Sequence, residues 1–277
     1  MSSQTNPSAR NDVAVLLARV LGRNRAWILA HGEAIVSEEE AATFMSYCER
    51  RRTGEPIAYI LGDAGFYGRD FLVNEHVLVP RPETEQLVDE TIAFIRAPMR
   101  VLDLGTGCGA IGCTIAAETD AGVDATDSSG DALDVARENA RRHGVLDRVL
   151  FHKGDLAEPV KGNRYDVVIA NLPYVPTSRL KKRPDPTSFE PREALDGGPD
   201  GLAVYRKLMP SLPRLINEDG LVLMEAAPPT IEELAAMLQA ALPTFVIAVG
   251  NDYSGLPRYV KAIDRRSEGA TYRSSGV

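Results

Sequence analysis

The chain has 277 residues, of which 44% are hydrophobic and 25% are charged, as is ordinary for a globular protein. Its 39 acidic and 31 basic residues give a net charge of −8, which argues against binding to nucleic acid through a broad basic face. Three cysteines without framework spacing and four scattered histidines predict neither a disulfide scaffold nor a zinc site or other metal site.

The same features indicate the compartment in which the protein works. The cysteine usage fits a reducing cytoplasm, and residues 1–12 are polar and lack the apolar core of a signal peptide. No stretch approaches the roughly 20 apolar residues that a membrane span requires. We therefore expect a cytoplasmic protein that has no contact with a membrane.

The first part of the chain is expected to be a disordered tail over residues 1–11 followed by a small helical bundle over residues 12–65. Apolar residues recur at helical spacing from Val13, and a short second helix is expected over residues 25–31. Ser37 and Glu40 form a capping-box pattern that starts a third helix, which ends near Gly54. A bundle of this size buries little surface by itself, so we expect it to pack on something larger.

A hairpin and a linker helix are predicted over residues 66–98. Short strands are expected over residues 66–73 and 77–79, with a polar turn at Asn74-Glu75 between them. The "PRPETE" sequence over residues 80–85 carries ordinary helix-start signals, and this helix is expected to reach Arg96.

Residues 99–264 alternate between buried strands and helices, and residues 265–277 are expected to be a disordered tail. Alternation of this kind predicts an α/β fold with a doubly wound, seven-stranded, mostly parallel sheet of the Rossmann-like type. The strands are predicted over residues 101–104, 123–126, 149–151, 165–170, 221–224, 245–249 and 258–262. The helices are predicted over residues 110–117, 131–143, 202–215 and 231–242.

A glycine-rich turn follows the first of these strands. Ligands of such sheets bind outside the carboxyl ends of the strands, and glycines there allow positive φ and close approach of the backbone. The turn also opens a helix, whose N-terminus favours negative charge. Taken alone, it could serve NAD or be a simple tight turn. The sequence reads Asp103-Leu104-Gly105-Thr106-Gly107-Cys108-Gly109.

Two further carboxylates follow the next strands. Asp127 stands about twenty residues after the glycines, the offset of a ribose-binding carboxylate, although it could instead cap a helix. Asp155 follows the third strand, where an adenine amino group would lie, and it too could be a capping residue. Asp103 would repel a pyrophosphate but suits a cofactor that carries an ammonium and a sulfonium.

Together these residues resemble the S-adenosylmethionine-binding class of methyltransferases, and a dehydrogenase becomes a minor interpretation. The class implies S-adenosyl-L-methionine as cofactor and S-adenosyl-L-homocysteine as product. The residues expected to contact the cofactor are Asp103, Gly105, Thr106, Gly107, Cys108, Gly109, Asp127, Asp155, Leu156 and Asn171.

The predicted strand over residues 165–170 ends in Asn171-Leu172-Pro173-Tyr174. A loop start with a core tyrosine would explain these residues alone, but they resemble the Asn/Asp/Ser-Pro-Pro-Tyr signature of enzymes that methylate planar amino groups. The Asn171 side-chain oxygen and the Leu172 carbonyl could accept both hydrogens of such a nitrogen and aim it. Pro173 would hold the turn, and the Tyr174 ring would stack on the planar group.

The motif departs from that signature at Leu172, where proline is usual. Because the acceptor there is a backbone carbonyl, the chemistry should survive with one less rigid φ. The Asn-Leu-Pro-Tyr form also resembles rRNA adenine dimethyltransferases. The motif alone therefore leaves glutamine, adenine and related acceptors open.

Two longer stretches resemble the HemK/PrmC family, which methylates a glutamine side-chain amide in peptide-chain release factors. They are "FYGRDFLVNEHVLVPRPETEQLVDE" over residues 66–90 and "FEPREALDGGPDGLAVYR" over residues 189–206. The similarity extends from about Val13 to Ala262 and so includes the helical bundle. It implies a release factor as the protein partner.

The resemblance also implies a set of substrate-binding residues. Arg81, Glu83 and Thr84 would lie near the mouth of the cofactor and substrate site, and Glu190 would lie on a loop that closes over the substrate. Leu156 departs from the family, which often places an aromatic ring there. The segment after Glu225 also departs, because it reads Ala226-Ala227-Pro228 where the family usually has Ile-Gly and then a glutamine.

These departures leave other substrates open. A relative acting on the guanidine of free arginine would need a carboxylate in its pocket, because guanidinium holds its proton tightly, and Glu190 is the candidate. A nucleic-acid adenine methyltransferase is a third hypothesis, opposed by the acidic balance although residues 179–183 are basic. A solvated loop would explain that run as well. A non-catalytic binding module would leave the set of cofactor residues without a purpose.

Overall fold

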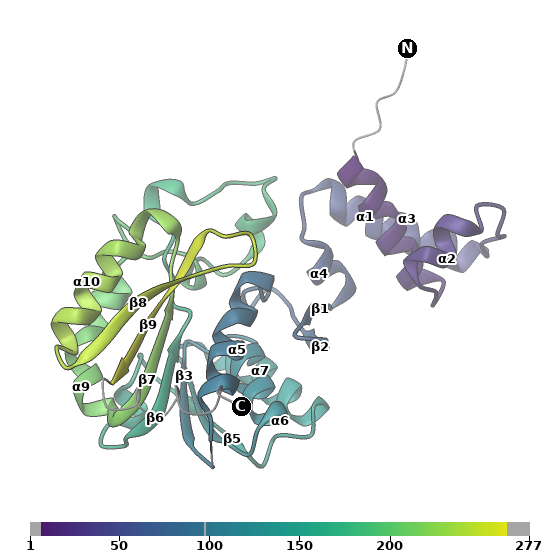
Figure 1. Ribbon diagram of the computed structural model, residues 1–277. Coiled ribbons are helices and arrows are strands. Elements are labelled where there is room, and N and C mark those ends of the chain that lie inside the picture. The colour runs from purple at the N-terminus through teal and green to yellow at the C-terminus, as the bar shows by residue number, and fades with distance from the viewer. Residues whose placement is uncertain (1–6, 97, 265–277) are drawn as a thin grey trace, which may run out of the picture.

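The computed structural model describes residues 7–96 and 98–264, and Figure 1 shows a group of N-terminal helices beside a larger part built on a sheet. The tail predicted over residues 265–277 and residues 1–6 of the first predicted tail lie outside these ranges. The first helix begins at Pro7, earlier than expected. The N-terminal helices are α1 (Pro7–Val20), α2 (Arg25–Ala30), α3 (Glu38–Arg52) and α4 (Ile57–Leu61).

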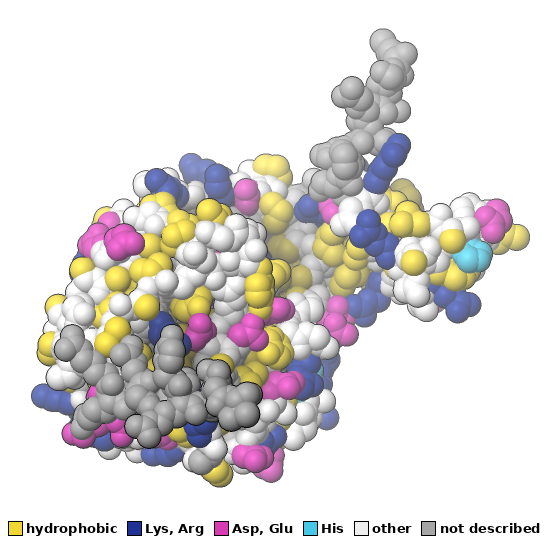
Figure 2. All heavy atoms as spheres, in the orientation of Figure 1, with side chains coloured by type: hydrophobic (Ala, Val, Ile, Leu, Met, Phe, Trp, Pro, Cys, Tyr) yellow, Lys and Arg dark blue, Asp and Glu magenta, His cyan; other side chains and the backbone are white. Residues whose placement is uncertain are grey.

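Helices α2 and α3 are held by local bonds more than by burial, whereas Leu16 of α1 and Ile60 of α4 are buried. The Ser37 hydroxyl accepts a hydrogen bond from the Glu40 backbone N–H, and the Glu40 carboxylate accepts one from the Ser37 N–H, so the predicted capping box is present. No residue of α2 or α3 is buried, while Leu29 and Met45 are exposed. Figure 2 shows hydrophobic side chains on the surface of this part of the molecule.

The hairpin after α4 differs from the prediction. It consists of β1 (Asp63–Phe66) and β2 (Arg69–Leu72), which pair antiparallel. Its turn is Tyr67-Gly68, with φ of 51° and 69°, as tight two-residue hairpins require. The turn predicted at Asn74-Glu75 is present, because the Val77 N–H donates to the Asn74 carbonyl oxygen at 3.2 Å, but it is not the turn of the hairpin. The strand predicted over residues 77–79 is wrong, because these residues form no strand.

The larger part is built on a seven-stranded sheet in the order β5-β4-β3-β6-β7-β9-β8. All its strands run parallel except β9, which is antiparallel to both of its neighbours. The predicted seven-stranded, mostly parallel sheet is thereby confirmed. The strands are β3 (Arg100–Leu104), β4 (Gly122–Asp127), β5 (Val149–Lys153), β6 (Tyr165–Ala170), β7 (Ile216–Glu225), β8 (Phe245–Asn251) and β9 (Pro257–Asp264).

Helices cover both faces of this sheet (Figure 1). Successive strand residues enter different cores: Val101 packs in the core under α5, α6 and α7, and Leu102 packs in the core under α8, α9 and α10. The helix predicted over residues 202–215 is interrupted, because Pro210 and Pro213 lack the N–H groups that a continuous helix needs. The helices are α5 (Glu85–Phe94), α6 (Ala110–Glu118), α7 (Gly130–Arg142), α8 (Ala203–Leu208), α9 (Leu212–Leu215) and α10 (Ile231–Ala241).

The loop between β6 and α8 packs against the N-terminal helices. It carries three single-turn 3₁₀ helices (Thr177–Arg179, Pro186–Phe189 and Arg192–Ala194) and passes directly over Gly54, which follows α3. A Cβ atom on Gly54 would lie 2.0 Å from the Pro184 carbonyl oxygen, so only glycine fits. Within the described ranges, no helix is both long and apolar enough to cross a membrane.

This contact can be tested with two matched glycine substitutions. Gly54 and Gly62 both have positive φ, but a Cβ on Gly62 meets nothing within 4 Å. Gly62→Ala should therefore cost only the strain of a left-handed alanine, about 1–2 kcal/mol. Gly54→Ala should cost about 1–3 kcal/mol more, because the Pro184 loop must move. Free energies of unfolding from urea titrations measure both, and equal losses would contradict the packing.

Candidate active site

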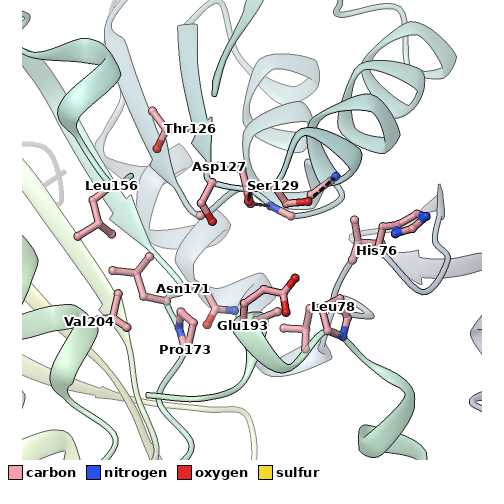
Figure 3. A pocket seen from close by; sticks show the side chains of 18 of the residues that line it. His76, Leu78, Thr126, Asp127, Ser129, Leu156, Asn171, Pro173, Glu193 and Val204 are labelled. Carbon is pink, nitrogen blue, oxygen red and sulfur yellow. Dashed lines mark hydrogen bonds between the residues drawn. The ribbon is translucent and has the colours of Figure 1, made fainter. Parts of the chain in front are cut away.

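A cavity of about 240 Å³ opens at the carboxyl ends of β3, β4, β5 and β6. Figure 3 shows side chains from several of these strand ends pointing into it. It lies at the edge where doubly wound sheets bind their ligands. Its walls are formed by His76, Val77, Leu78, Gly105, Gly107, Thr126, Asp127, Ser128, Ser129, Ala132, Asp155, Leu156, Asn171, Leu172, Pro173, Pro191, Glu193, Ala194 and Val204.

The glycine turn after β3 presents bare backbone to the cavity at Gly105 and Gly107. The N–H groups of Gly105 and Thr106 both donate to the Thr126 carbonyl oxygen, at 2.9 and 3.0 Å, which ties the turn to β4. A Cβ atom on Gly105 would lie 2.9 Å from Leu172 Cδ2, and its φ is +70°. The positive φ favours glycine at this position, and a larger residue would also have to displace the end of the Leu172 side chain.

Asp103 lies beneath this turn and does not line the cavity. It is fully buried, and its Oδ2 accepts hydrogen bonds from the Thr106 hydroxyl at 2.6 Å and the Gly112 N–H at 3.0 Å. Its Oδ1 has no hydrogen-bond partner in the part of the chain that the structure describes. Burial raises the pKa of Asp103 to about 6. The carboxylate thus holds the turn in shape from behind.

The other predicted members of the turn also act as supports. The Cys108 carbonyl accepts a hydrogen bond from Asn139 Nδ2 at 2.8 Å, and burial raises the pKa of its thiol to about 12. Gly109 stands at the start of α6, where a Cβ would lie 3.2 Å from the Ala136 Cβ of α7. These contacts pack the turn against α6 and α7, and neither residue reaches the cavity.

Asp127 ends β4 and faces the cavity (Figure 3). Its Oδ2 accepts the Gly107 N–H and its Oδ1 accepts the Ser129 N–H, both at 2.9 Å. The N-cap of α7 is Ser129, so the capping alternative for Asp127 is wrong. Burial raises the pKa of Asp127 above its ordinary value. Each of its oxygens keeps a lone pair for a ligand hydroxyl.

Asp155 and Leu156 lie where β5 gives way to the next turn, and both line the cavity. The Asp155 carboxylate forms an ion pair with the Lys207 ammonium at the surface. Leu156 has φ of 50°, and with Val204 it supplies an apolar side of the cavity, while Leu78 lies across the cavity from them (Figure 3).

Asn171, Leu172 and Pro173 line the opposite side of the cavity, and Tyr174 does not. Asn171 Nδ2 donates to Thr84 Oγ1 at 3.2 Å. Instead of facing the cavity, the Tyr174 hydroxyl donates to the buried Glu225 carboxylate at 3.0 Å. Desolvation and the nearby Glu225 raise the pKa of Tyr174 well above its ordinary value.

The residues assigned to substrate by family resemblance also lie outside the cavity. Arg81 Nη2 donates to both oxygens of Glu190 at 2.7 Å, and the Glu190 side chain is only 2% exposed. Burial raises the pKa of Glu190, while the charge of Arg81 opposes this rise. The pair ties the start of the helical segment at Pro82 to the loop after β6. Glu83 is half-buried and Thr84 is buried beside Asn171.

Sequence analysis missed several of the residues that build the site. Val77 and Leu78 belong to the predicted strand over residues 77–79, and Glu193, which faces the cavity from the loop after β6, is not among the predicted site residues. Glu225 enters the prediction only as the residue before a divergent segment. A charge that ends an apolar strand at a buried sheet edge was the signal for it, since burying a lone carboxylate is costly.

The sequence agrees with known families over most of its length. Residues 2–62 match the PrmC N-terminal domain, and residues 85–183 match the methyltransferase small domain. A release factor glutamine methyltransferase of Bacillus anthracis is 35% identical over 268 residues, which cover 94% of each chain. One of Caulobacter vibrioides is 38% identical over 245 residues, covering 86% of this chain and 84% of the relative.

The chain belongs to the PrmC family of release factor glutamine methyltransferases. This PrmC-family protein is therefore an enzyme, a methyltransferase that depends on S-adenosylmethionine. A solved methyltransferase structure from Pyrococcus furiosus covers 83% of this chain and 99% of its own, with a TM-score of 0.52 at 18% identity. That likeness concerns the fold alone, and it agrees with the Rossmann-like sheet.

The buried Asp103 should make the free energy of unfolding of this PrmC-family chain depend on pH. Its pKa is about 6 against an ordinary 3.8, so the folded protein keeps a proton that the unfolded chain releases between those values. The free energy of unfolding should therefore fall as pH rises through this window, by up to about 3 kcal/mol. Asp103→Asn keeps an oxygen acceptor but removes the titration.

Urea titrations of both proteins between about pH 4 and pH 7 measure the effect. The wild-type stability minus that of Asp103→Asn should decrease as pH rises. Parallel curves for the two proteins would show that Asp103 titrates normally.

Proposed function

We propose that this enzyme transfers a methyl group from S-adenosylmethionine to the side-chain amide nitrogen of a glutamine in a peptide-chain release factor. The substrate is that named for its relatives. One observation carries the chemistry: Asn171 and Leu172 line the same cavity as Gly107 and Asp127. The two candidate acceptors for an amide N–H therefore border the space proposed for the cofactor.

The residues that line the cavity fit this cofactor. The two lone pairs left on Asp127 can accept the two ribose hydroxyls, and Leu156 and Val204 offer apolar contact to an adenine ring. Asp127 and Glu193 also make the cavity acidic, while the charge of Asp155 is paired with Lys207. That charge suits a ligand with an ammonium and a sulfonium and disfavours a pyrophosphate.

The acceptor nitrogen needs help from the protein, because its lone pair is delocalised into the carbonyl. When bound, S-adenosylmethionine supplies a methyl group on a positively charged sulfur. The Asn171 side-chain oxygen and the Leu172 carbonyl accept the two N–H groups, which fixes the nitrogen in one orientation. They also favour electron density on it as the bond forms, since each N–H becomes more acidic at that point. Overall, the nitrogen exchanges one proton for the methyl group.

Free arginine is less well supported as an acceptor. Glu190 was the carboxylate proposed to hold its guanidinium, but Glu190 already binds the guanidinium of Arg81 through both oxygens. Any free guanidine would have to displace the Arg81 guanidinium from this buried carboxylate. A glutamine side chain carries no charge and needs no such carboxylate.

The substrate is tested by offering methyl-labelled S-adenosylmethionine with a release factor, free arginine and free glutamine in parallel. Label should enter the release factor alone and map to a glutamine after proteolysis. A release factor with that glutamine replaced by asparagine serves as the control and should take up none. Label in free arginine alone would reject the proposed substrate.

Asn171 and Asp127 should separate catalysis from cofactor binding. Asn171→Ala should lower kcat by about 10²–10³, as loss of a transition-state contact does, with S-adenosylmethionine still bound in calorimetry. Asp127→Ala should instead weaken the cofactor Kd by about 10- to 100-fold. Asp134→Ala removes an exposed carboxylate from the same region, on α7, and should leave that Kd unchanged. An unchanged Kd in Asp127→Ala would remove this residue from the site.

A further inference from the structure

The side-chain amide of Asn171 can face the cavity with either of its two ends. Its oxygen accepts hydrogen bonds, whereas its nitrogen only donates them. An N–H group of the substrate is bound by the oxygen and repelled by the nitrogen. The proposed chemistry therefore requires something in the protein to select the orientation of this amide.

The Asn171 amide nitrogen is the first member of a buried chain of hydrogen bonds. Asn171 Nδ2 donates to Thr84 Oγ1 at 3.2 Å, and the Thr84 hydroxyl donates to Glu225 Oε2 at 2.7 Å. The other oxygen of Glu225 accepts the Tyr174 hydroxyl at 3.0 Å. Thr84 is 4% exposed and Glu225 is 1% exposed, so water does not compete for these partners. These hydrogen bonds join Thr84 to Asn171, 87 residues away in sequence, and to Glu225, 141 residues away.

Glu225, at the end of this series of hydrogen bonds, determines which group donates and which accepts in each bond. An ionised carboxylate can only accept, so the single hydroxyl proton of Thr84 is committed to Glu225. The Thr84 oxygen then has only lone pairs to offer to Asn171. It must be met by Nδ2, and this leaves the amide oxygen of Asn171 for the cavity that the residue lines.

The surroundings of Glu225 act on its pKa in both directions. Burial raises the pKa of Glu225 above its ordinary value, and this outweighs the hydrogen bonds from Thr84 and Tyr174 and the positive charge of Arg258, which lower it. Glu83 raises it slightly further. Two donors on one carboxylate are the arrangement that an ionised acid requires and that a protonated one does not.

The second acceptor is held at the same strand end. The Leu172 N–H donates to the Tyr205 hydroxyl oxygen at 3.2 Å, which fixes the plane of the peptide group before Leu172. The Tyr205 hydroxyl lies in turn against the backbone carbonyls of Glu225 and Ala170, and its side chain is fully buried. Glu225 thus supports Asn171 through its side chain and the Leu172 backbone through its carbonyl.

We propose that Glu225 is a positioning residue, which acts through Thr84 to turn the Asn171 oxygen toward the acceptor nitrogen. This inference rests on the proposed function and adds two residues that touch neither substrate nor cofactor. Thr84 thereby has a role different from the substrate contact that family resemblance implied.

The test compares two substitutions of Thr84 in the full-length enzyme with a release factor as substrate. Thr84→Val keeps the shape of the side chain and removes the hydroxyl, whereas Thr84→Ser keeps the hydroxyl. Thr84→Val should lower kcat by about 10- to 100-fold, with little change in the KM for the release factor or the Kd for S-adenosylmethionine. Thr84→Ser should retain most of the wild-type kcat.

The same substitution in an Asn171→Ala background separates positioning from a general structural role. Because Thr84 acts through Asn171, Thr84→Val should cause no further loss of the residual, radiolabel-detected activity there. A full additional loss in that background would show that Thr84 acts by another route and would overturn the proposal. Retained kcat in the single Thr84→Val variant would overturn it as well.

Glu225→Gln provides a second variant in case Thr84→Val fails to fold. It is isosteric and neutral, and an NH2 group that only donates replaces one of the two oxygens that accept from Thr84 and Tyr174, so kcat should again fall while the cofactor Kd is kept. An unchanged kcat would contradict the role of Glu225. Failure of the proposed function gives a different result, namely no label in the release factor with the wild-type enzyme.

Discussion

The site depends on the parallel register of the central strands. Leu104 of β3 pairs with Thr126 of β4 and with Ala170 of β6, and Ala170 pairs in turn with Met224 of β7. The next residue along each strand therefore falls in one row across the edge of the sheet. That row consists of Gly105, Asp127, Asn171 and Glu225. A shift of one residue in any pairing would turn the corresponding side chain to the other face.

This register explains why much of the site could be predicted from sequence. Apolar runs mark the parallel strands, and the residue that ends each run must lie at the shared edge. Asp127 and Asn171 are such residues, and both line the cavity. Local pattern was also sufficient for β6 and for the capping box of α3, because both depend on residues close in sequence.

The failures of prediction have long-range or conformational causes. The hairpin turn at Tyr67-Gly68 carries a bulky residue at positive φ, which no local rule favours, while Asn74 gave a stronger turn signal. Asp103 has the residue type of a ligand, but burial beneath the glycine turn makes it a support. The link between Thr84 and Glu225 spans 141 residues, and only the packing of α5 beside β7 brings the two together.

The contact between Gly54 and Pro184 has a consequence for the evolution of this architecture. The N-terminal helices and the loop after β6 fit each other through backbone atoms at a position with no room for a side chain. Neither segment can be transplanted from a distant homologue without its counterpart. The two should therefore be inherited as a pair, although strands β3 to β6 separate them along the chain.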